Sequence, residues 1–147
     1  GLGKAKAAQI VSVLELANRI NKDQPEILSA EDVWKLCADI RESKKEHFLA
    51  FYLDTQNCLI ERQIISIGIL NSSLVHPREV FEPAIKLSAA SVLIAHNHPS
   101  GILDPSGEDR EVTKRLVDAG NLLGITVIDH IILGKNGHWS FQQAKLL

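Results

Sequence analysis

Methionine is absent from this sequence, cysteine is scarce, and long apolar runs are missing. A chain that starts at Gly1 without methionine leads us to expect either a piece of a longer protein or a chain trimmed at its start. The two cysteines, Cys37 and Cys58, cannot make a disulfide framework, and we expect both to pack in the core. No apolar run approaches the roughly 20 residues that cross a bilayer, which excludes a membrane span. With no secretory leader, we expect a cytoplasmic location.

The composition is that of a folded domain. The 147 residues are 45% hydrophobic and 23% charged, which excludes an intrinsically disordered chain. The length suits one domain, or one domain with a short appendage. A formal net charge of −2 counts against a general electrostatic attraction to nucleic acid and leaves room only for a local basic patch.

The beginning of the chain has helical periodicity. Residues 4–20 predict a helix, and the segment from Asn21 to Pro25 interrupts it. A second helix is predicted to start at Ser29, because Ser-Ala-Glu-Asp is typical of a helix N-terminus. The inward row of this second helix is Val33, Leu36, Cys37 and Ile40. A charged linker, residues 41–45, follows it.

From residue 46 onward the hydrophobic period becomes that of strands. Strands are predicted at residues 47–53, 59–69, 91–95, 126–133 and 138–141. Helices are predicted at 77–87, which Pro83 would kink or shorten, and at 106–121, which Gly124 ends. The inward row of the latter is Val112, Leu116, Ala119 and Leu123. The whole pattern predicts a mixed α/β (α+β) domain, a sheet flanked by helices, with a short N-terminal helical segment.

The segment from His96 to Asp109 carries the most distinctive chemistry. His96 and His98 leave a buried strand, and because i and i+2 side chains share a face, both imidazoles can reach one ion. The prolines and glycine that follow turn the chain, so that Ser106 and Asp109 approach the histidines. Two histidines and one aspartate suit Zn²⁺, and three protein ligands leave a fourth position for water, as in catalytic zinc sites.

These residues also have purely structural explanations. Ser106-x-x-Asp109 is a helix N-cap pattern, and capping is the commoner role for such a pair. The two histidines would then be ordinary loop residues. Ser106 can satisfy both interpretations if it accepts the capping bond through a lone pair and donates its proton elsewhere. We interpret His130 as a packed, hydrogen-bonded residue and His76 as a loop or cap residue.

The spacing His-x-His, seven residues, then Ser-x-x-Asp resembles the metal signature of the JAB1/MPN (JAMM) metallopeptidases. Together with LNSSLVHPREVF at 70–81 and AHNHPSG at 95–101, it makes the chain from residue 43 onward similar to the bacterial RadC family, which was named for DNA repair. The resemblance implies a cytidine-deaminase-like mixed sheet in a bacterial cytoplasmic protein, with His96, His98 and Asp109 holding one Zn²⁺ per chain. Asn97 stands where the deubiquitinating branch carries Ser or Thr, which counts against ubiquitin-like substrates.

The resemblance also implies hydrolysis of a peptide or isopeptide bond. The family needs an upstream glutamate as general base, and Glu46, directly before a strand, occupies that place. Glu79 is the competing candidate, although the helix dipole already explains it. Zinc would lower the pKa of its bound water towards about 7, and Glu46 would carry the proton to the leaving amine. Ser106 Oγ would donate to the oxyanion.

Residues Gly1 to Ala7 are similar to the second half of a helix-hairpin-helix motif, whose glycines let backbone N–H groups approach a DNA phosphate. We therefore expect residues 1–42 to be a helical remnant of that region and 43–147 to be the RadC-like domain. The alternative function is DNA repair or recombination, with DNA bound through a missing N-terminal hairpin region and the metal site serving another or no catalytic role. A third hypothesis, an interaction module without catalysis, is disfavoured because every motif position is present. The sequence specifies neither the peptide or protein substrate nor the oligomeric state.

Overall fold

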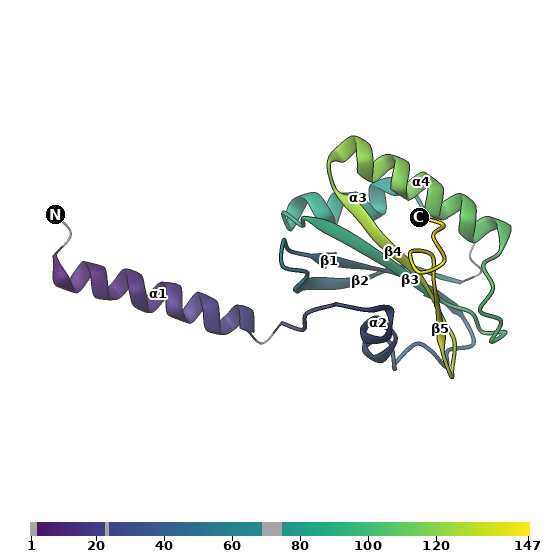
Figure 1. The fold of residues 1–147 in the computed structure, drawn as a ribbon, viewed down its shortest axis with the longest axis horizontal. Coiled ribbons are helices and arrows are strands. Elements are labelled where there is room, and N and C mark those ends of the chain that lie inside the picture. Colours follow the sequence, from purple (N-terminus) through teal and green to yellow (C-terminus); the bar gives the residue numbers. More distant parts are fainter. Residues whose placement is uncertain (1–2, 23, 69–74) are drawn as a thin grey trace.

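Five strands and four helices make up the computed structural model, which describes residues 3–22, 24–68 and 75–147 (Figure 1). In chain order they are α1 (Lys4–Lys22), α2 (Ala30–Leu36), β1 (Glu46–Leu53), β2 (Leu59–Gly68), α3 (Pro77–Lys86), β3 (Ser91–Asn97), α4 (Gly107–Leu123), β4 (Thr126–Leu133) and β5 (His138–Ser140). The predicted α/β (α+β) class is confirmed. Ile69 of the second predicted strand, the 70–74 part of the resembling segment, and Gly1 and Leu2 lie outside the described residues.

The strands form one mixed sheet in the order β2-β1-β3-β4-β5. β1 runs antiparallel to β2 and β3, β3 runs parallel to β4, and β5 is antiparallel to β4. β3 is buried along its whole length, as its apolar run from Val92 to Ala95 predicts, and the polar His96 and Asn97 at its end are buried as well. It extends two residues further than predicted because His96 and Asn97 stay paired with Ile132 and Leu133 of β4. The first histidine of the pair is therefore a strand residue with a fixed direction.

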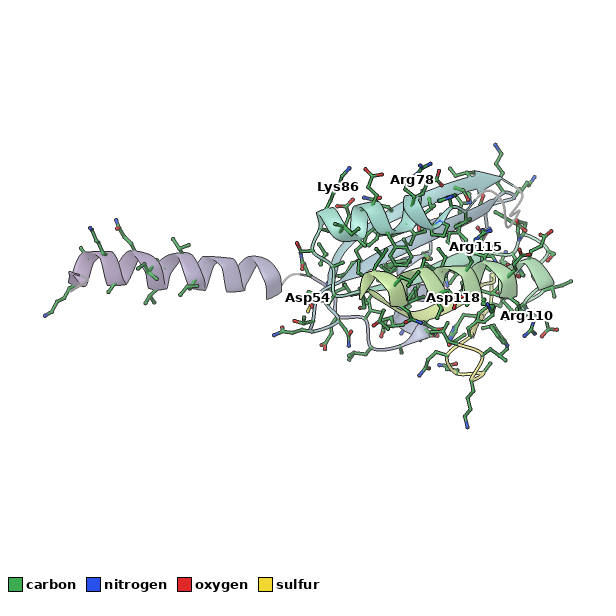
Figure 2. The ribbon with its side chains drawn as sticks, turned by 90° about the horizontal axis from the view of Figure 1, so that it is seen from above. Asp54, Arg78, Lys86, Arg110, Arg115 and Asp118 are labelled. Atoms are coloured by element: carbon green, nitrogen blue, oxygen red, sulfur yellow. The ribbon has the colours of Figure 1, made fainter. Side chains whose placement is uncertain are left out.

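Helices cover both faces of this sheet, and the sheet separates the hydrophobic core into two clusters. α3 and α4 lie side by side on one face (Figure 2). Their buried side chains pack with Phe48, Tyr52 and Ile94 of the sheet. α2 packs on the opposite face, against Leu49 and Phe51. Burying a large apolar side chain of this kind contributes about 1.5–3 kcal/mol to stability. The face under α4 is also the face on which the metal-ligand candidates of β3 lie.

The N-terminal helix α1 is set apart from this core. It extends away from the sheet in Figure 1, and its apolar side chains Ile10, Val11 and Leu14 are exposed. α2, by contrast, shares a core with the sheet, so residues from Ile27 onward pack with β1 and β3. The division at residues 1–42 and 43–147, and DNA binding through the N-terminal region, stay predictions. No helix of the described residues has the length and apolar character that crossing a membrane requires.

Two local predictions are wrong in detail. Leu123, expected to face inward, is 49% exposed, because the chain crosses to β4 beneath Gly120 and leaves the last turn of α4 outside. A Cβ on Gly120 would lie 2.4 Å from the Ile125 carbonyl oxygen, so the crossing is close. Cys37 is buried, whereas Cys58 is only half-buried beside the turn before β2. Pro83 lies inside α3, which ends at Lys86, close to the predicted end at Leu87.

Candidate metal centre

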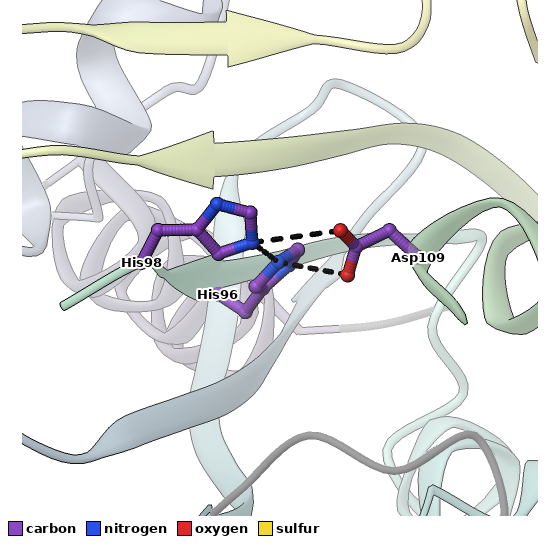
Figure 3. Close-up of side chains that lie close together, drawn as sticks. All are labelled: His96, His98 and Asp109. Carbon is purple, nitrogen blue, oxygen red and sulfur yellow. Dashed lines mark hydrogen bonds and ion pairs between the residues drawn. The ribbon is translucent and has the colours of Figure 1, made fainter. Parts of the chain in front are cut away.

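His96, His98 and Asp109 converge at the carboxyl end of β3 beneath the first turn of α4 (Figure 3). His96 Nε2 lies 2.8 Å from His98 Nε2 and 3.0 Å from Asp109 Oδ1. His98 Nε2 lies 3.5 Å from Asp109 Oδ2. One ligand atom from each residue therefore fits within 4.8 Å of the others, which is close enough for the three to hold one metal ion. Their roles as ligands were predicted from spacing, and the geometry brings all three together.

The helix cap and the metal site use the same aspartate without conflict. Ser106 is the N-cap of α4, and its Oγ accepts a hydrogen bond from the Asp109 backbone N–H at 3.1 Å. The Ser106 backbone N–H and hydroxyl both donate to Asp109 Oδ2, each at 2.7 Å. The capping box therefore satisfies Oδ2 and fixes the carboxylate plane. Oδ1 is left aimed at His96.

Asp109 Oδ1 is the observation that tests whether a cation fits here. It is buried and accepts no hydrogen bond within the described part of the chain, although an unsatisfied buried oxygen is costly. Burial raises the pKa of Asp109, but the adjacent imidazoles of His96 and His98 outweigh this, together with the hydrogen bond from Ser106, and hold the pKa well below its usual range. A divalent cation bound between this oxygen and the two imidazoles would neutralise its buried negative charge. Nitrogen and carboxylate ligands in this number suit Zn²⁺.

His98 has one ring nitrogen committed elsewhere. Its Nδ1–H donates to the backbone carbonyl of Ile102 in the loop after β3, so a neutral ring presents its Nε2 lone pair to the site. The hydrogen bond with Asp109 raises the pKa of His98, burial opposes this, and the Ile102 carbonyl and the charge of Glu46 raise it further. A proton on His98 and a metal ion therefore compete for the same nitrogen.

This competition predicts opposite pH trends with and without zinc. The pKa of His98 is raised above its usual 6.5, so its proton stabilises the metal-free fold at acidic pH, and that contribution is lost as pH rises through the raised value. Zinc binding needs the ring deprotonated, so zinc affinity should increase over the same pH range. Thermal unfolding with zinc and with chelator, measured from mildly acidic to mildly basic pH, should give a difference in Tm that grows with pH. A difference that shrinks as pH rises would contradict this assignment.

Glu46 is placed beside the histidines by the register of β1 on β3. Phe48 pairs with His96, and alternation then puts Glu46 and His98 on the same face of the neighbouring chains. Its charge is among those that raise the pKa of His98. A groove of about 450 Å³ borders Glu46 and is lined by Lys44, Lys45, Ile67, Gly68, Pro99 and Ser100. Glu79, the competing candidate, is exposed in the first turn of α3.

Asn97 fixes the backbone on both sides of Glu46. Its Oδ1 accepts from the His47 N–H at 2.8 Å, and its Nδ2 donates to the Lys45 carbonyl at 3.0 Å. Asn97 is fully buried, so both bonds are shielded from water. The strand that carries the proposed base is thereby tied to the strand that carries the proposed ligands. In the sequence alone, this asparagine is distinctive only as a departure from a related branch.

Two further residues, which the sequence alone did not connect with the site, lie against it. His130 of β4 and Thr113 of α4 are buried and linked to each other, with Thr113 Oγ1 2.6 Å from His130 Nδ1. His130 Nε2 lies 2.8 Å from His96 Nδ1. The interpretation of His130 as a packed, hydrogen-bonded residue is confirmed, and His76, the N-cap of α3, is indeed a cap. A histidine inside an apolar strand was the available signal for His130, but the strand order that makes it a neighbour of His96 was not.

The mixed sheet and the His-x-His and Ser-x-x-Asp arrangement define a JAB-type domain. The profile of the RadC-like JAB domain matches residues 27–146, and the chain belongs to this family. Proteins called "UPF0758 protein" from Methanosarcina mazei and Methanosarcina acetivorans are each 50% identical over 147 residues, covering 97% of this chain and 64% of the relative. A third, from Rubrobacter xylanophilus, is 50% identical over 152 residues, covering all of this chain and 66% of the relative. The chain thus spans about two-thirds of the length of these relatives.

Proposed function

We propose that this chain is a zinc-dependent hydrolase of peptide or isopeptide bonds. The observation that carries the proposal is Asp109 Oδ1, which is buried beside the Nε2 atoms of His96 and His98 and has no hydrogen-bond partner among the described residues. Three protein ligands are the number found in catalytic zinc sites, whereas structural sites usually have four. Bound zinc would supply a Lewis acid that activates water at neutral pH and polarises a carbonyl.

The remaining chemistry belongs to residues of this chain. Glu46 accepts the proton of the attacking water and returns it to the leaving amine, which is the ordinary work of a general base placed beside a metal site. The groove beside Glu46 has a volume of about 450 Å³, and its wall includes Ile67 and Gly68 of β2. We expect a peptide to lie along this wall with its scissile bond towards His98.

The hydroxyl of Ser106 already has a hydrogen-bond partner, which limits how it can assist hydrolysis. Its hydroxyl proton is directed to Asp109 Oδ2, so donation to an oxyanion requires the hydroxyl to rotate. The Ser106 backbone N–H, which donates to the same Oδ2, keeps that oxygen satisfied when the hydroxyl turns away. Ser106 can then stabilise the developing negative charge, a contribution worth about 10²–10³ in rate.

The setting we propose is the cytoplasm, where thiols stay reduced. Cys37 and Cys58 are both free in the structure, which is consistent with that setting.

A cleavage screen tests the proposed function. The zinc-loaded chain is incubated with a library of short peptides and with lysine-linked isopeptides, and products are identified by mass spectrometry. Cleavage should stop when a chelator is added and return when zinc is restored. A chain that binds one zinc ion and cleaves no amide bond in either library would contradict the hydrolase assignment.

A further inference from the structure

A buried chain of hydrogen bonds runs from the backbone of α4 to Nδ1 of His96, the ring nitrogen that faces away from the metal position. Its members are the Asp109 carbonyl, the Thr113 hydroxyl, the ring of His130 and the ring of His96. His96 and His130 are fully buried and Thr113 is 2% exposed, so water has no access to these bonds. Phe48 and Phe141 pack against the His130 ring and hold it in place.

The direction of each hydrogen bond in this chain follows from the Asp109 carbonyl at one end of it. A backbone carbonyl can only accept a hydrogen bond, so the Thr113 hydroxyl donates its single proton to the Asp109 carbonyl. Thr113 Oγ1 must then accept from His130 Nδ1–H at 2.6 Å. A neutral imidazole carries one N–H, so His130 Nε2 is bare and accepts from His96 Nδ1–H at 2.8 Å.

The last consequence concerns the metal. With its proton on Nδ1, neutral His96 offers the lone pair of Nε2 to the position shared with His98 and Asp109 Oδ1. The opposite tautomer would put a hydrogen atom where a metal ion has to bind.

We infer that Thr113 and His130 are positioning residues that select the metal-binding tautomer of His96. The inference rests on the proposed function only in requiring that the site holds zinc, and it needs no catalytic turnover. It concerns which ring nitrogen carries the proton, because the count of protons is the same in both tautomers. Partners of this kind usually change metal affinity by about 10–100-fold when they are removed.

The same backbone carbonyl ties the selection to the ligand set. Asp109 supplies Oδ1 to the metal position, and its main-chain oxygen orders the protons that reach His96. A single residue in the first turn of α4 therefore arranges two of the three ligands. Loss of the helix turn would remove both contributions together, whereas loss of the Thr113 hydroxyl removes only one.

Thr113→Val tests the inference, with Thr113→Ser as the matched variant that keeps the hydroxyl. Val removes the acceptor for His130 Nδ1–H, so His130 can turn its proton towards His96 and force the Nε2–H tautomer there. We expect zinc affinity, measured by competition with a chromophoric chelator, to fall by about 10–100-fold in Thr113→Val and to stay near the unaltered value in Thr113→Ser. Equal zinc affinity in all three chains would overturn the inference.

Nitrogen-15 NMR of the metal-free, unaltered chain supplies a readout that depends on no variant. Two-bond proton–nitrogen correlations should show His96 protonated at Nδ1, at a pH where His98 is neutral. A His96 ring protonated at Nε2 would overturn the inference even if Thr113→Val fails to fold. If zinc binds and depends on the hydroxyl while no amide bond is cleaved, the hydrolase proposal fails and the inference stands. If the unaltered chain binds no zinc, both fail.

Discussion

Glu46→Gln is expected to lower the rate of amide hydrolysis by about 10²–10⁴-fold while zinc binding is largely retained. Glutamine keeps the size of the side chain and removes the carboxylate that accepts the proton of water. Glu46 is no ligand in the cluster of His96, His98 and Asp109, so the metal affinity should change little. Steady-state kcat/KM with a cleaved peptide and zinc content per chain measure the two effects separately.

Glu79→Gln is the matched control for this prediction. Glu79 is the other candidate for the general base, and it lies exposed in the first turn of α3, where its carboxylate complements the helix dipole. We expect normal turnover and at most a small loss of stability from this variant. If Glu46→Gln were as active as the unaltered chain and Glu79→Gln had lost activity, Glu79 of α3 would be the general base instead.

Asp109→Asn is expected to reduce zinc affinity by at least about 100-fold, more than the loss of an outer partner of a ligand. The change removes the negative charge of the carboxylate and replaces Oδ1, a buried oxygen with no hydrogen-bond partner in the part of the chain that the structure describes. It also weakens the capping box of α4, which costs about 0.5–2 kcal/mol if the cap is lost. Isothermal titration with zinc and thermal unfolding in chelator distinguish the two contributions.

The chain contains its own control for the capping contribution. Ser29 and Asp32 cap α2 with the same spacing, and Asp32 Oδ2 accepts from the Ser29 hydroxyl at 2.8 Å and from the Leu28 N–H at 3.1 Å. Asp32→Asn should therefore show a similar loss of stability with no change in zinc affinity. If it weakened zinc binding as much as Asp109→Asn, the effect at Asp109 would be one of folding.

These two caps show how far the sequence alone reaches. Ser29-x-x-Asp32 and Ser106-x-x-Asp109 have the same pattern, and both are helix N-caps in the structure. Capping depends only on local backbone geometry, which is why it was predictable at both places. What distinguishes Asp109 is the histidine pair at the end of β3, and that spacing was visible in the sequence as well.

The parts that could not be predicted depend on strand order and register. His130 is 34 residues from His96 and becomes its neighbour only because β4 pairs in parallel with β3. Asn97 reaches the backbone around Glu46 across 50 residues through the β1–β3 pairing. Periodicity gives the type of each element and carries no information on such pairing. Leu123 was misplaced for a similar reason, because the crossing beneath Gly120 is a tertiary contact.

The most direct test of the central claim is X-ray absorption at the zinc edge on the purified, unaltered chain prepared with zinc at neutral pH. We predict about one zinc ion per chain with nitrogen or oxygen neighbours only, at about 2.0–2.2 Å. The shell should contain two imidazoles and lose the carboxylate contribution in Asp109→Asn. A chain that retains no zinc, or a shell with a sulfur neighbour at about 2.3 Å, would contradict the account.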